Sequence, residues 1–334
     1  MASVVIAIPA RNSAKTLRPT LDSAIAQTHE ELEILVVDNA SDDDTSAIAN
    51  EYADRDPRVR LLRYEKLVSA EENFNRCLEL AAGKLVAILH ADDIYEPQMI
   101  EEQVAFLQRH PQCEVVFTHA KIIDAEGNVV GERYRPDELR SSNVILDHGD
   151  LLKLVAKYGN FLTCPSALMR ADTFGGVLGG WNGPEFASSA DLDLWIRASL
   201  RGPIGFMTAP LMQYRVSEVS FSVAMQKVRT TRHPLFKVLD HHLRELSDDP
   251  EVQRNLKFLE AKDAALVCMN HMKRGEDVEA RMRLSLAEYA QALLDSRYQR
   301  RFAIRMAAIG LFEKLYGLNS LKPLISAVFA RVRA

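Results

Sequence analysis

The chain has 334 residues, of which 47% are hydrophobic and 26% are charged. That length can bury a full hydrophobic core and exceeds one compact domain, so we expect a catalytic domain with an appended region. The net charge of -5 gives no general field that attracts polyanions, which argues against nucleic acid as a partner.

The cysteines and apolar runs indicate the cellular setting. The four cysteines lie far apart and form no CxxC pair, so we expect buried free thiols in a reducing cytosol. The N-terminus has no basic leader, and its short apolar run predicts a first strand. No stretch approaches the roughly twenty apolar residues of a membrane-spanning helix. We therefore expect a cytoplasmic protein that is soluble or bound to the inner face of the membrane.

The N-terminal segments predict a β-α-β unit. Residues 3–8 and 32–37 are continuous apolar runs, which is typical of central parallel strands covered on both faces. Between them, residues 13–27 carry apolar side chains at helical spacing, and Ser13 is the expected N-cap.

The alternation of strands and helices continues along the chain. We expect a helix over 45–52, a strand over 59–62, and then a helix whose capping box is Ser69 with Glu72 and whose stop is Gly83. This pattern predicts an α/β fold with a mostly parallel sheet.

The next strand, residues 84–90, runs into the acidic pair Asp92 and Asp93, and Pro97 then opens another helix. In open α/β sheets, ligands bind at the carboxyl ends of the strands because loops and helix N-termini converge there. We therefore expect the acidic pair to lie at a ligand-binding edge. Residues 115–134 predict a further strand and a hairpin with its turn at Glu-Gly-Asn.

Polar residues that could carry chemistry follow the first two strands. The loop amides and Arg11 after the first strand could hold a base or a phosphate, although such a turn serves equally well as a helix cap. Asp38 ends the second strand, where a carboxylate can accept a hydrogen bond from a ribose hydroxyl or a base N–H.

The pair Asp92 and Asp93 predicts a cation site. Adjacent carboxylates repel each other when both are ionised, so a divalent metal is the economical explanation for the pair. A site with few protein ligands, all of them oxygens, favours Mg²⁺ or Mn²⁺, because the ion can also bind the diphosphate of a substrate. The alternative is that the pair caps the following helix. His90 could be a core histidine, a donor to phosphate or a metal ligand.

A second acidic segment lies about a hundred residues further on. Asp191 and Asp193 precede an amphipathic helix, where Asp191 could face the cleft and one of the two is an ordinary cap. Trp195 and Arg197 in the same helix are expected to be packing and surface groups.

Taken in order, several short segments resemble the family 2 glycosyltransferases with the GT-A fold. That resemblance covers residues 3 to about 217 and implies a Rossmann-like, mostly parallel sheet flanked by helices. No GxGxxG follows the first strand and no GxxxxGK[ST] occurs, so dinucleotide-binding and P-loop folds lose support. The matching segments are IPARN, VVDNASDDDTS, GKLVAILHADDIYEP, GGW, ADLDLWIR and YRV.

The resemblance assigns residues to the nucleotide-sugar donor. Ile8, Pro9, Ala10 and Arg11 would lie along the nucleotide, and Asp38 would contact its base or ribose. The implied domains are a catalytic domain over 1–218, with a nucleotide-sugar-binding half over 1–97 and an acceptor half over 98–218, and a C-terminal helical region over 219–334.

The resemblance also assigns the reacting groups. Ala91, Asp92 and Asp93 would contact the nucleotide sugar. Asp92 would also be the metal ligand that corresponds to the last acid of the family's DxD element, and Asp93 would be a substrate contact or support. Asp191 would be the general base that takes the acceptor proton, and Trp181 would sit where the acceptor enters and stack on a sugar face.

Three positions depart from the family pattern. The first acid of DxD is replaced by His90 or Ala91, depending on the alignment. Ala190 stands where the family often has Glu before the base, and Ser217 stands where many relatives have a His near the metal.

The predicted function is therefore transfer of a hexose-type sugar from a nucleoside diphosphate, UDP being the most expected, to an acceptor hydroxyl with inversion and with Mn²⁺ or Mg²⁺. The acceptor is expected to be a glycan or a lipid-linked molecule of cell-surface polysaccharide or glycolipid synthesis. One alternative is an inactive sugar-nucleotide or glycan-binding subunit, given the incomplete DxD. A sugar-phosphate nucleotidyltransferase would need a Gly-rich first loop, which residues 8–16 lack.

The C-terminal region carries a further expectation. From Arg297 onward the chain is locally basic, and apolar residues recur at helical spacing. Such helices could lie on an anionic membrane surface, or they could pack on the catalytic domain or on another subunit.

Overall fold

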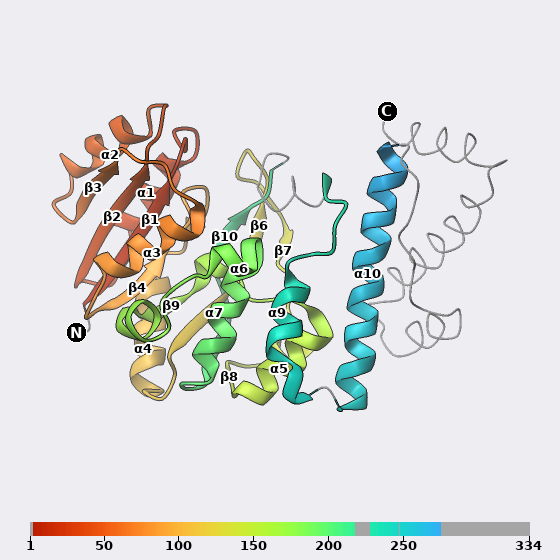
Figure 1. The fold of residues 1–334 in the computed structure, drawn as a ribbon. Helices are drawn as coiled ribbons and strands as arrows, with labels where there is room; N and C mark the ends of the chain where they lie inside the picture. The colour runs from red at the N-terminus through yellow and green to blue at the C-terminus, as the bar shows by residue number, and fades with distance from the viewer. Residues whose placement is uncertain (1–2, 218–227, 247, 275–334) are drawn as a thin grey trace. The chain divides into compact units, whose positions relative to one another are not determined.

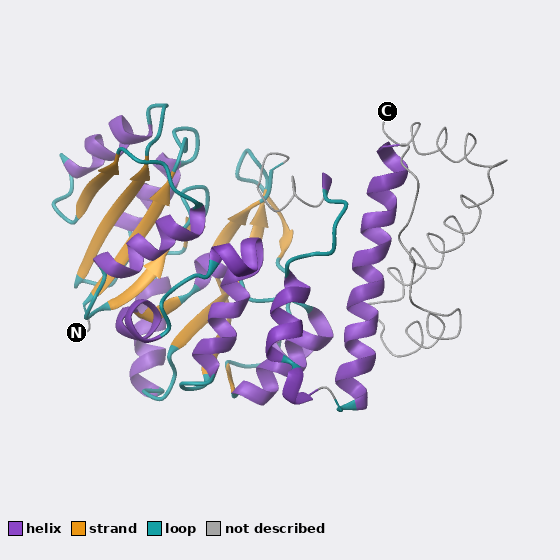
Figure 2. Cartoon of the chain, in the orientation of Figure 1, coloured by secondary structure: helices purple, strands orange, loops and turns teal. Residues whose placement is uncertain are grey.

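The computed structural model describes residues 3–217, 228–246 and 248–274. The chain forms two compact units, of which the first comprises residues 1–155 and 160–217 and the second comprises 156–159 and 218–334. In the first unit, a sheet of ten described strands has helices on both faces (Figure 1; Figure 2). The predicted fold class, a mostly parallel sheet flanked by helices, is confirmed.

Four parallel strands form the N-terminal half of the sheet. β1 (Val4–Ala10) pairs with β2 (Leu32–Asn39) on one side and with β4 (Leu85–Ile88) on the other, and β3 (Val59–Tyr64) pairs with β2. Apart from Pro9, every residue of β1 is buried, because helices cover both of its faces. The continuous apolar run therefore identified this strand correctly.

The connecting helices are amphipathic and bury one face each. α1 (Leu17–Ile25) and α2 (Thr45–Ala53) contact each other, and α3 (Ala70–Leu80) packs on β1 and β2. Ser69 is confirmed as the N-cap of α3, since its hydroxyl accepts from the backbone N–H of Glu72 at 3.1 Å, and the reciprocal Glu72 bond of a capping box stays a prediction.

The predicted N-cap at Ser13 is wrong. Thr16 precedes α1, and no side-chain hydrogen bond caps the helix. Ser13 instead starts a turn, with its carbonyl accepting from the backbone N–H of Leu17, and its own N–H donates to Thr45 Oγ1 at 2.8 Å. Bonding between the loops after β1 and β2 therefore delays the start of the helix.

The C-terminal half of the sheet mixes parallel and antiparallel strands. β6 (Val115–Ile123) and β10 (Ile204–Arg215) are parallel neighbours, and β9 (Leu168–Arg170) lies antiparallel between β4 and β6. The strand order along the sheet is β3-β2-β1-β4-β9-β6-β10-β5. The short remaining strands, all antiparallel to their partners, are β5 (Ile94–Tyr95), β7 (Val129–Glu132) and β8 (Val144–Leu146).

The hairpin predicted over 115–134 is confirmed, because β6 and β7 pair across a turn in which Gly127 has a φ of 93°. That left-handed backbone favours glycine. The remaining helices of this unit are α4 (Met99–Arg109), α5 (His148–Tyr158), α6 (Gly183–Phe186) and α7 (Ala190–Ser199). α7 packs on the sheet through Trp195, whose ring centre lies 5.0 Å from that of Phe117.

The described part of the second unit is largely helical, as expected, with α9 (Leu235–His242) and α10 (Pro250–Arg274). A buried ion pair between Arg229 and Asp263 joins the start of this part to α10. None of the helices in the described ranges has the length and apolar character needed to cross a bilayer. The basic stretch expected to begin at Arg297 lies outside the described residues.

Candidate active site

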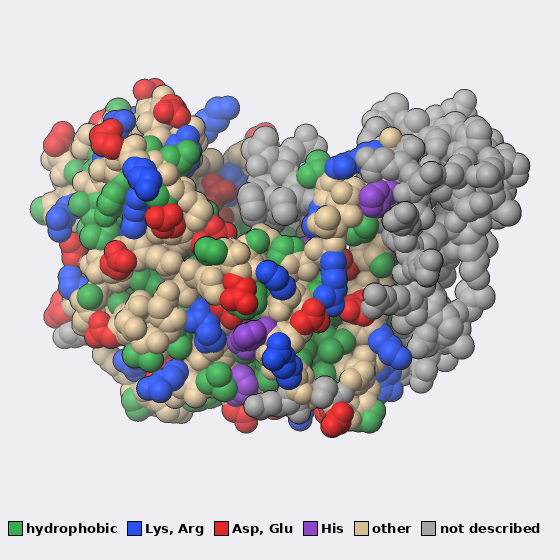
Figure 3. All heavy atoms as spheres, viewed as in Figure 1, with side chains coloured by type: hydrophobic (Ala, Val, Ile, Leu, Met, Phe, Trp, Pro, Cys, Tyr) green, Lys and Arg blue, Asp and Glu red, His purple; other side chains and the backbone are tan. Residues whose placement is uncertain are grey.

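The predicted site segments converge at the carboxyl edge of the parallel strands. β1 and β2 end at Ala10 and Asn39, and a turn carrying Asp92 and Asp93 follows β4. Because β9 runs in the opposite direction, the segment before it also reaches this edge. Figure 3 shows a hollow in the upper part of this unit, with acidic side chains inside it.

The turn after β4 is held by hydrogen bonds from three sides. The Asp93 backbone N–H donates to the His90 carbonyl at 3.3 Å, which closes the turn. The Tyr95 hydroxyl accepts from the His90 backbone N–H at 2.8 Å, and the Thr20 hydroxyl donates to the Asp93 carbonyl at 2.8 Å. The backbone of the acidic pair is thus fixed independently of its carboxylates.

Arg215, the last residue of β10, ties this turn to the other half of the sheet. Its backbone N–H donates to Asp93 Oδ1 and its Nε donates to the Asp92 carbonyl, both at 2.8 Å. Its Nη1 donates to the carbonyls of Asp124 and Ala125 in the β6–β7 hairpin. The guanidinium is therefore a structural link between β4, β10 and the hairpin.

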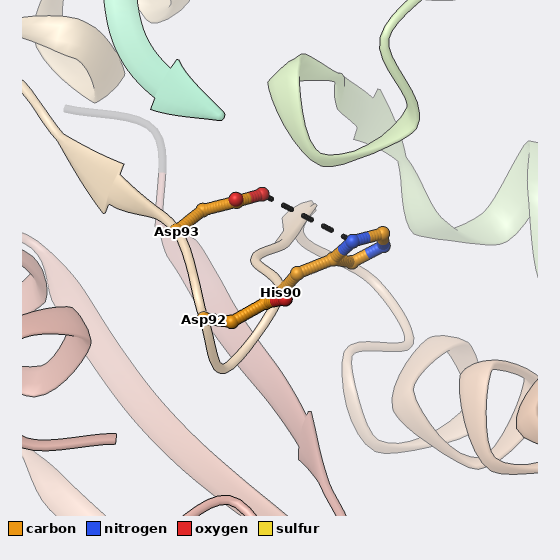
Figure 4. A group of neighbouring side chains, drawn as sticks. All are labelled: His90, Asp92 and Asp93. Carbon is orange, nitrogen blue, oxygen red and sulfur yellow. Dashed lines mark ion pairs between the residues drawn. The ribbon is translucent and has the colours of Figure 1, made fainter. Parts of the chain in front are cut away.

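The side chains of His90, Asp92 and Asp93 form a candidate cation site (Figure 4). One ligand atom from each lies within 4.8 Å of the others, and His90 Nδ1 lies 4.0 Å from Asp93 Oδ2. Ligands on opposite sides of Mg²⁺ stand about 4.2 Å apart, twice a bond length of about 2.1 Å. Only a small inward movement of the three ligand atoms would therefore bring them to bonding distance from an ion.

The electrostatics of this cluster also suit a cation. Asp93 is 1% exposed, and its Oδ2 and the buried Nε2 of His90 have no hydrogen-bond partner in the part of the chain that the structure describes. Burial and, next, the charge of Asp92 raise the pKa of Asp93 well above its usual value, whereas burial lowers the pKa of His90. Two carboxylates and an imidazole are a donor set that fits Mn²⁺ or Mg²⁺.

Asp191 lies in the first turn of α7 with both carboxylate oxygens hydrogen-bonded. The Asn160 side-chain amide donates to Oδ2 at 2.9 Å, and the Leu192 backbone N–H donates to Oδ1 at 2.7 Å. Burial raises the pKa of Asp191, and the bonds from Leu192 and Asn160 and the charge of Arg133 act in the opposite direction. A carboxyl with a raised pKa is a stronger base once it is ionised.

Asp191 and Asp93 are 98 positions apart in the sequence, yet the charges of both act on one thiol. That thiol belongs to Cys164, just before β9, and its pKa is raised by burial and then by the charges of Asp191 and Asp93. The positive charge of Arg133 opposes the rise in pKa that burial causes in both acids. Because charge effects weaken with distance, both acids lie within electrostatic range of Cys164.

The segment predicted to lie along the nucleotide offers few free side-chain atoms. Ile8 and Ala10 are buried in the core, and Pro9 is partly exposed. Arg11 extends across the loop after β2, where its Nη1 donates to the Asn39 carbonyl at 2.9 Å and its Nη2 lies 3.3 Å from Asp42 Oδ2. In this state Arg11 links the two loops.

Asp38 is completely buried and its carboxylate is satisfied within the protein. Oδ1 accepts from the backbone N–H and the hydroxyl of Ser41, and Oδ2 accepts from the Ser46 hydroxyl. A direct contact with a base or ribose would require Ser41 to move, so that contact stays a prediction. In the structure, the Asp38 carboxylate holds the loop that follows β2 through its bonds with Ser41.

Trp181 is 3% exposed and belongs to an aromatic cluster. Asn75 bonds both its backbone N–H, at 2.8 Å, and its carbonyl, at 3.0 Å. Its ring meets Phe74 and Trp195 edge to face, and Phe74 stacks on His90 with ring centres 5.7 Å apart. Stacking of Trp181 on a sugar would require its ring to be uncovered, so this contact stays a prediction.

Sequence reasoning missed four residues that surround the acids, namely Arg133, Asn160, Cys164 and Arg215. The run YRV marked the segment that contains Arg215 but gave that residue no role. No spacing pattern marks the other three, because each reaches the site through strand pairing or a loop rather than through its own segment.

Residues 5–174 match the family model described as Glycosyl transferase family 2. The chain belongs to this family. Among its relatives, it is 29% identical over 210 residues to the putative glycosyltransferase EpsE of Bacillus subtilis. The aligned residues make up 63% of this chain and 70% of EpsE. It is 24% identical over 234 residues to the putative teichuronic acid biosynthesis glycosyltransferase TuaG of the same organism, with 70% of this chain and 86% of TuaG covered.

Solved structures share the fold of this family 2 chain. The structure of residues 1–349 of S. aureus TarS in complex with UDP has a TM-score of 0.59 at 15% sequence identity and covers 95% of this chain and 92% of that one. The mannosyltransferase PcManGT of Pyrobaculum calidifontis, in complex with GDP-Man and Mn²⁺, has a TM-score of 0.54 at 16% identity and covers 98% of this chain and 86% of that one.

Proposed function

We propose that this glycosyltransferase moves a sugar from a nucleoside diphosphate to an acceptor hydroxyl with inversion and with the help of a divalent metal. The observation that carries the proposal is the meeting of two acidic groups at the carboxyl edge of the sheet. One is the cluster of His90, Asp92 and Asp93, and the other is Asp191.

The cluster after β4 is the proposed donor side of the reaction. Asp92, with His90 and Asp93, would hold Mg²⁺ or Mn²⁺, which when bound neutralises the departing diphosphate as a Lewis acid. Solved complexes of fold relatives contain UDP in one case and GDP-Man with Mn²⁺ in another, which supports a nucleotide-sugar donor. We propose UDP as the nucleotide, with its uridine beside Pro9, Arg11 and Asp38.

Asp191 is the proposed base on the acceptor side. Its carboxylate would take the proton of the acceptor hydroxyl while that oxygen attacks the anomeric carbon from the face opposite the leaving diphosphate. Attack from the opposite face inverts the configuration at that carbon. Asn160 would orient the carboxylate, since it already donates to Oδ2, and Trp181 would border the acceptor entrance.

For the biological context, we propose a cytoplasmic enzyme of cell-surface polysaccharide or glycolipid synthesis. The similarity to TuaG, which is described as a teichuronic acid biosynthesis enzyme, supports this context. The acceptor would then be a glycan or lipid-linked molecule that the enzyme meets at the inner face of the membrane.

The test is a turnover assay with a panel of UDP- and GDP-sugars, measuring nucleotide release with Mn²⁺, with Mg²⁺ and after chelation. Asp191→Asn should lower the rate by about 10²- to 10⁴-fold, the usual contribution of a general base. In Asp92→Ala, the rate of nucleotide release should no longer depend on added Mn²⁺ or Mg²⁺. Asp137→Asn is the matched control, because this acid is exposed and pairs with Arg140.

A different result would contradict each proposed role. Undiminished turnover by Asp191→Asn would remove the base, and equal rates before and after chelation would remove the role of Asp92. Nucleotide binding without turnover of any sugar nucleotide would indicate the binding-subunit alternative instead.

A further inference from the structure

Arg133 follows β7, and two contacts fix its position. Its backbone N–H donates to the Ala120 carbonyl at 2.9 Å, and its guanidinium carbon lies 4.9 Å from the centre of the Tyr214 ring. Tyr214 directly precedes Arg215, whose backbone N–H binds Asp93. The contact with Tyr214 therefore places the Arg133 guanidinium beside the residue that precedes the backbone partner of Asp93.

The charge of Arg133 also acts on Asp191, the proposed base. It opposes burial, which raises the pKa of Asp191. Since Coulomb attraction weakens with distance, the guanidinium lies within electrostatic range of this carboxylate. No hydrogen bond joins the two in the described part of the chain, so Asp191 does not use the N–H groups of Arg133.

The Nε of Arg133 is buried and has no hydrogen-bond partner among the described residues. The other arginines near this edge are engaged differently. Arg215 donates to three backbone carbonyls, and Arg11 donates to the loop after β2. A buried N–H without a partner is costly, and an oxyanion that enters the site would satisfy it.

We propose that Arg133 binds the terminal phosphate of the nucleoside diphosphate and stabilises the charge that this phosphate gains during transfer. This inference rests on the proposed function. In that reaction the bond between the anomeric carbon and the phosphate oxygen breaks, and its electron pair stays on the oxygen. The acceptor oxygen forms the new bond, and its proton goes to Asp191. The diphosphate therefore gains one negative charge.

The position of Arg133 favours the donor phosphate over an anionic group of the acceptor. Arg133 contacts Tyr214, the neighbour of the residue whose backbone binds Asp93, and its charge also acts on Asp191. We therefore infer that the guanidinium lies near the bond that breaks, where the leaving phosphate gains negative charge. A guanidinium also matches a phosphate well, since it can donate two parallel hydrogen bonds to two oxygens.

The experiment compares the binding of UDP and UMP by isothermal titration calorimetry at one fixed Mn²⁺ concentration, with GDP and GMP in parallel. The variants are Arg133→Gln and Arg133→Lys. Arg135→Gln is the matched control, because Arg135 lies on the same segment and donates to the Thr208 carbonyl at 3.0 Å. Arg135→Gln removes one positive charge, as Arg133→Gln does.

Arg133→Gln should weaken UDP binding by about tenfold to a hundredfold, the range expected for loss of a charge-assisted hydrogen bond. UMP binding should stay within about twofold of the wild type, because UMP lacks the terminal phosphate. Arg133→Lys should fall between wild type and Arg133→Gln, and Arg135→Gln should bind both nucleotides as the wild type does.

Three results would overturn the inference. The first is unchanged UDP affinity in Arg133→Gln, including the case in which transfer falls, since Arg133 would then act on the acceptor. The second is an equal loss of UDP and UMP binding, which would indicate a distorted site. The third is a wild-type protein that binds none of the four nucleotides, which would overturn the proposed donor and, with it, this role.

Discussion

Replacing Asn160 by alanine should reduce turnover mainly at low pH. The Asn160 amide donates to Asp191 Oδ2 at 2.9 Å, and this bond favours the ionised carboxylate. Burial raises the pKa of Asp191, and the loss of the bond would leave burial less opposed. Because a base acts only when ionised, the variant needs a higher pH than the wild type to reach full activity.

The magnitude follows from the contacts of Asp191. A hydrogen bond to a charged group contributes about 1.5–3 kcal/mol, and Asp191 keeps its second bond, from the Leu192 N–H. We therefore take the lower end of that range. About 1.4 kcal/mol corresponds to a factor of ten in an equilibrium constant, so turnover on the acid side should fall about tenfold. On the high-pH plateau, where the carboxyl is ionised in both proteins, the rates should agree within about twofold.

The assay is the initial rate of nucleotide release across the pH range at saturating sugar nucleotide. Asn143→Ala is the control, since Asn143 is exposed and accepts from the Thr208 backbone N–H, away from the acids. A carbon NMR titration of the Asp191 carboxyl measures the same change without any substrate. An acid limb that coincides with the wild type, or one displaced to lower pH, would refute the reasoning.

Three further predictions concern stability and are read by thermal unfolding. Ser46→Ala should lower the free energy of unfolding by about 1.5–3 kcal/mol, because the buried Oδ2 of Asp38 loses its donor; a loss below about 0.5 kcal/mol would contradict this account. Gly180→Ala should cost about 1–3 kcal/mol, since φ is 71° and an added Cβ would lie 2.1 Å from Asn75 Oδ1; an unchanged transition would show that the loop adapts freely. Asp191→Asn should stabilise the protein at neutral pH, because a carboxyl whose folded pKa is raised favours folding below its unfolded pKa and loses that contribution as pH rises. The gain should vanish in acid, and a gain that persists there would need another cause.

The N-terminal half of the fold could be predicted because its signals are local. The strands there have continuous apolar runs, the helices have apolar residues at helical spacing, and the Ser69 N-cap bonds to Glu72 only three residues on. The failure at Ser13 has a non-local cause. Its N–H binds Thr45, 32 residues away, and no pattern within residues 13–27 reveals that bond.

The C-terminal half depends on contacts between distant segments. β9 has three residues and lies between β4 and β6, so its identity as a strand comes from partners far away in the sequence. A π-helix over Asp172–Val177 follows it. Local propensity is a weak guide where pairing decides the structure.

The candidate site shows the same contrast between local and distant signals. Asp92 and Asp93 follow a predicted strand and Asp191 lies in the first turn of a predicted helix, so local patterns made them candidates, and their roles stay predictions. Arg215 and Arg133 could not be predicted, since their places depend on the pairing of β10 and β7 with β6. The sequence therefore predicted candidate acids and missed these two cations.

The acidic turn divides its hydrogen-bonding groups between folding and binding. Arg215 binds Asp93 Oδ1 and the Asp92 carbonyl, which fixes the turn, whereas Asp93 Oδ2 and His90 Nε2 form no hydrogen bond within residues 3–217, 228–246 and 248–274. Nε of Arg133 forms none with these residues either. A buried polar group without a hydrogen bond costs about 1–3 kcal/mol, so these three groups lower the stability of a marginally stable domain. Two are possible ligands for a cation and one is a donor for an oxyanion. Since a metal diphosphate presents both, the atoms that weaken the isolated domain are those that the proposed donor complex would satisfy.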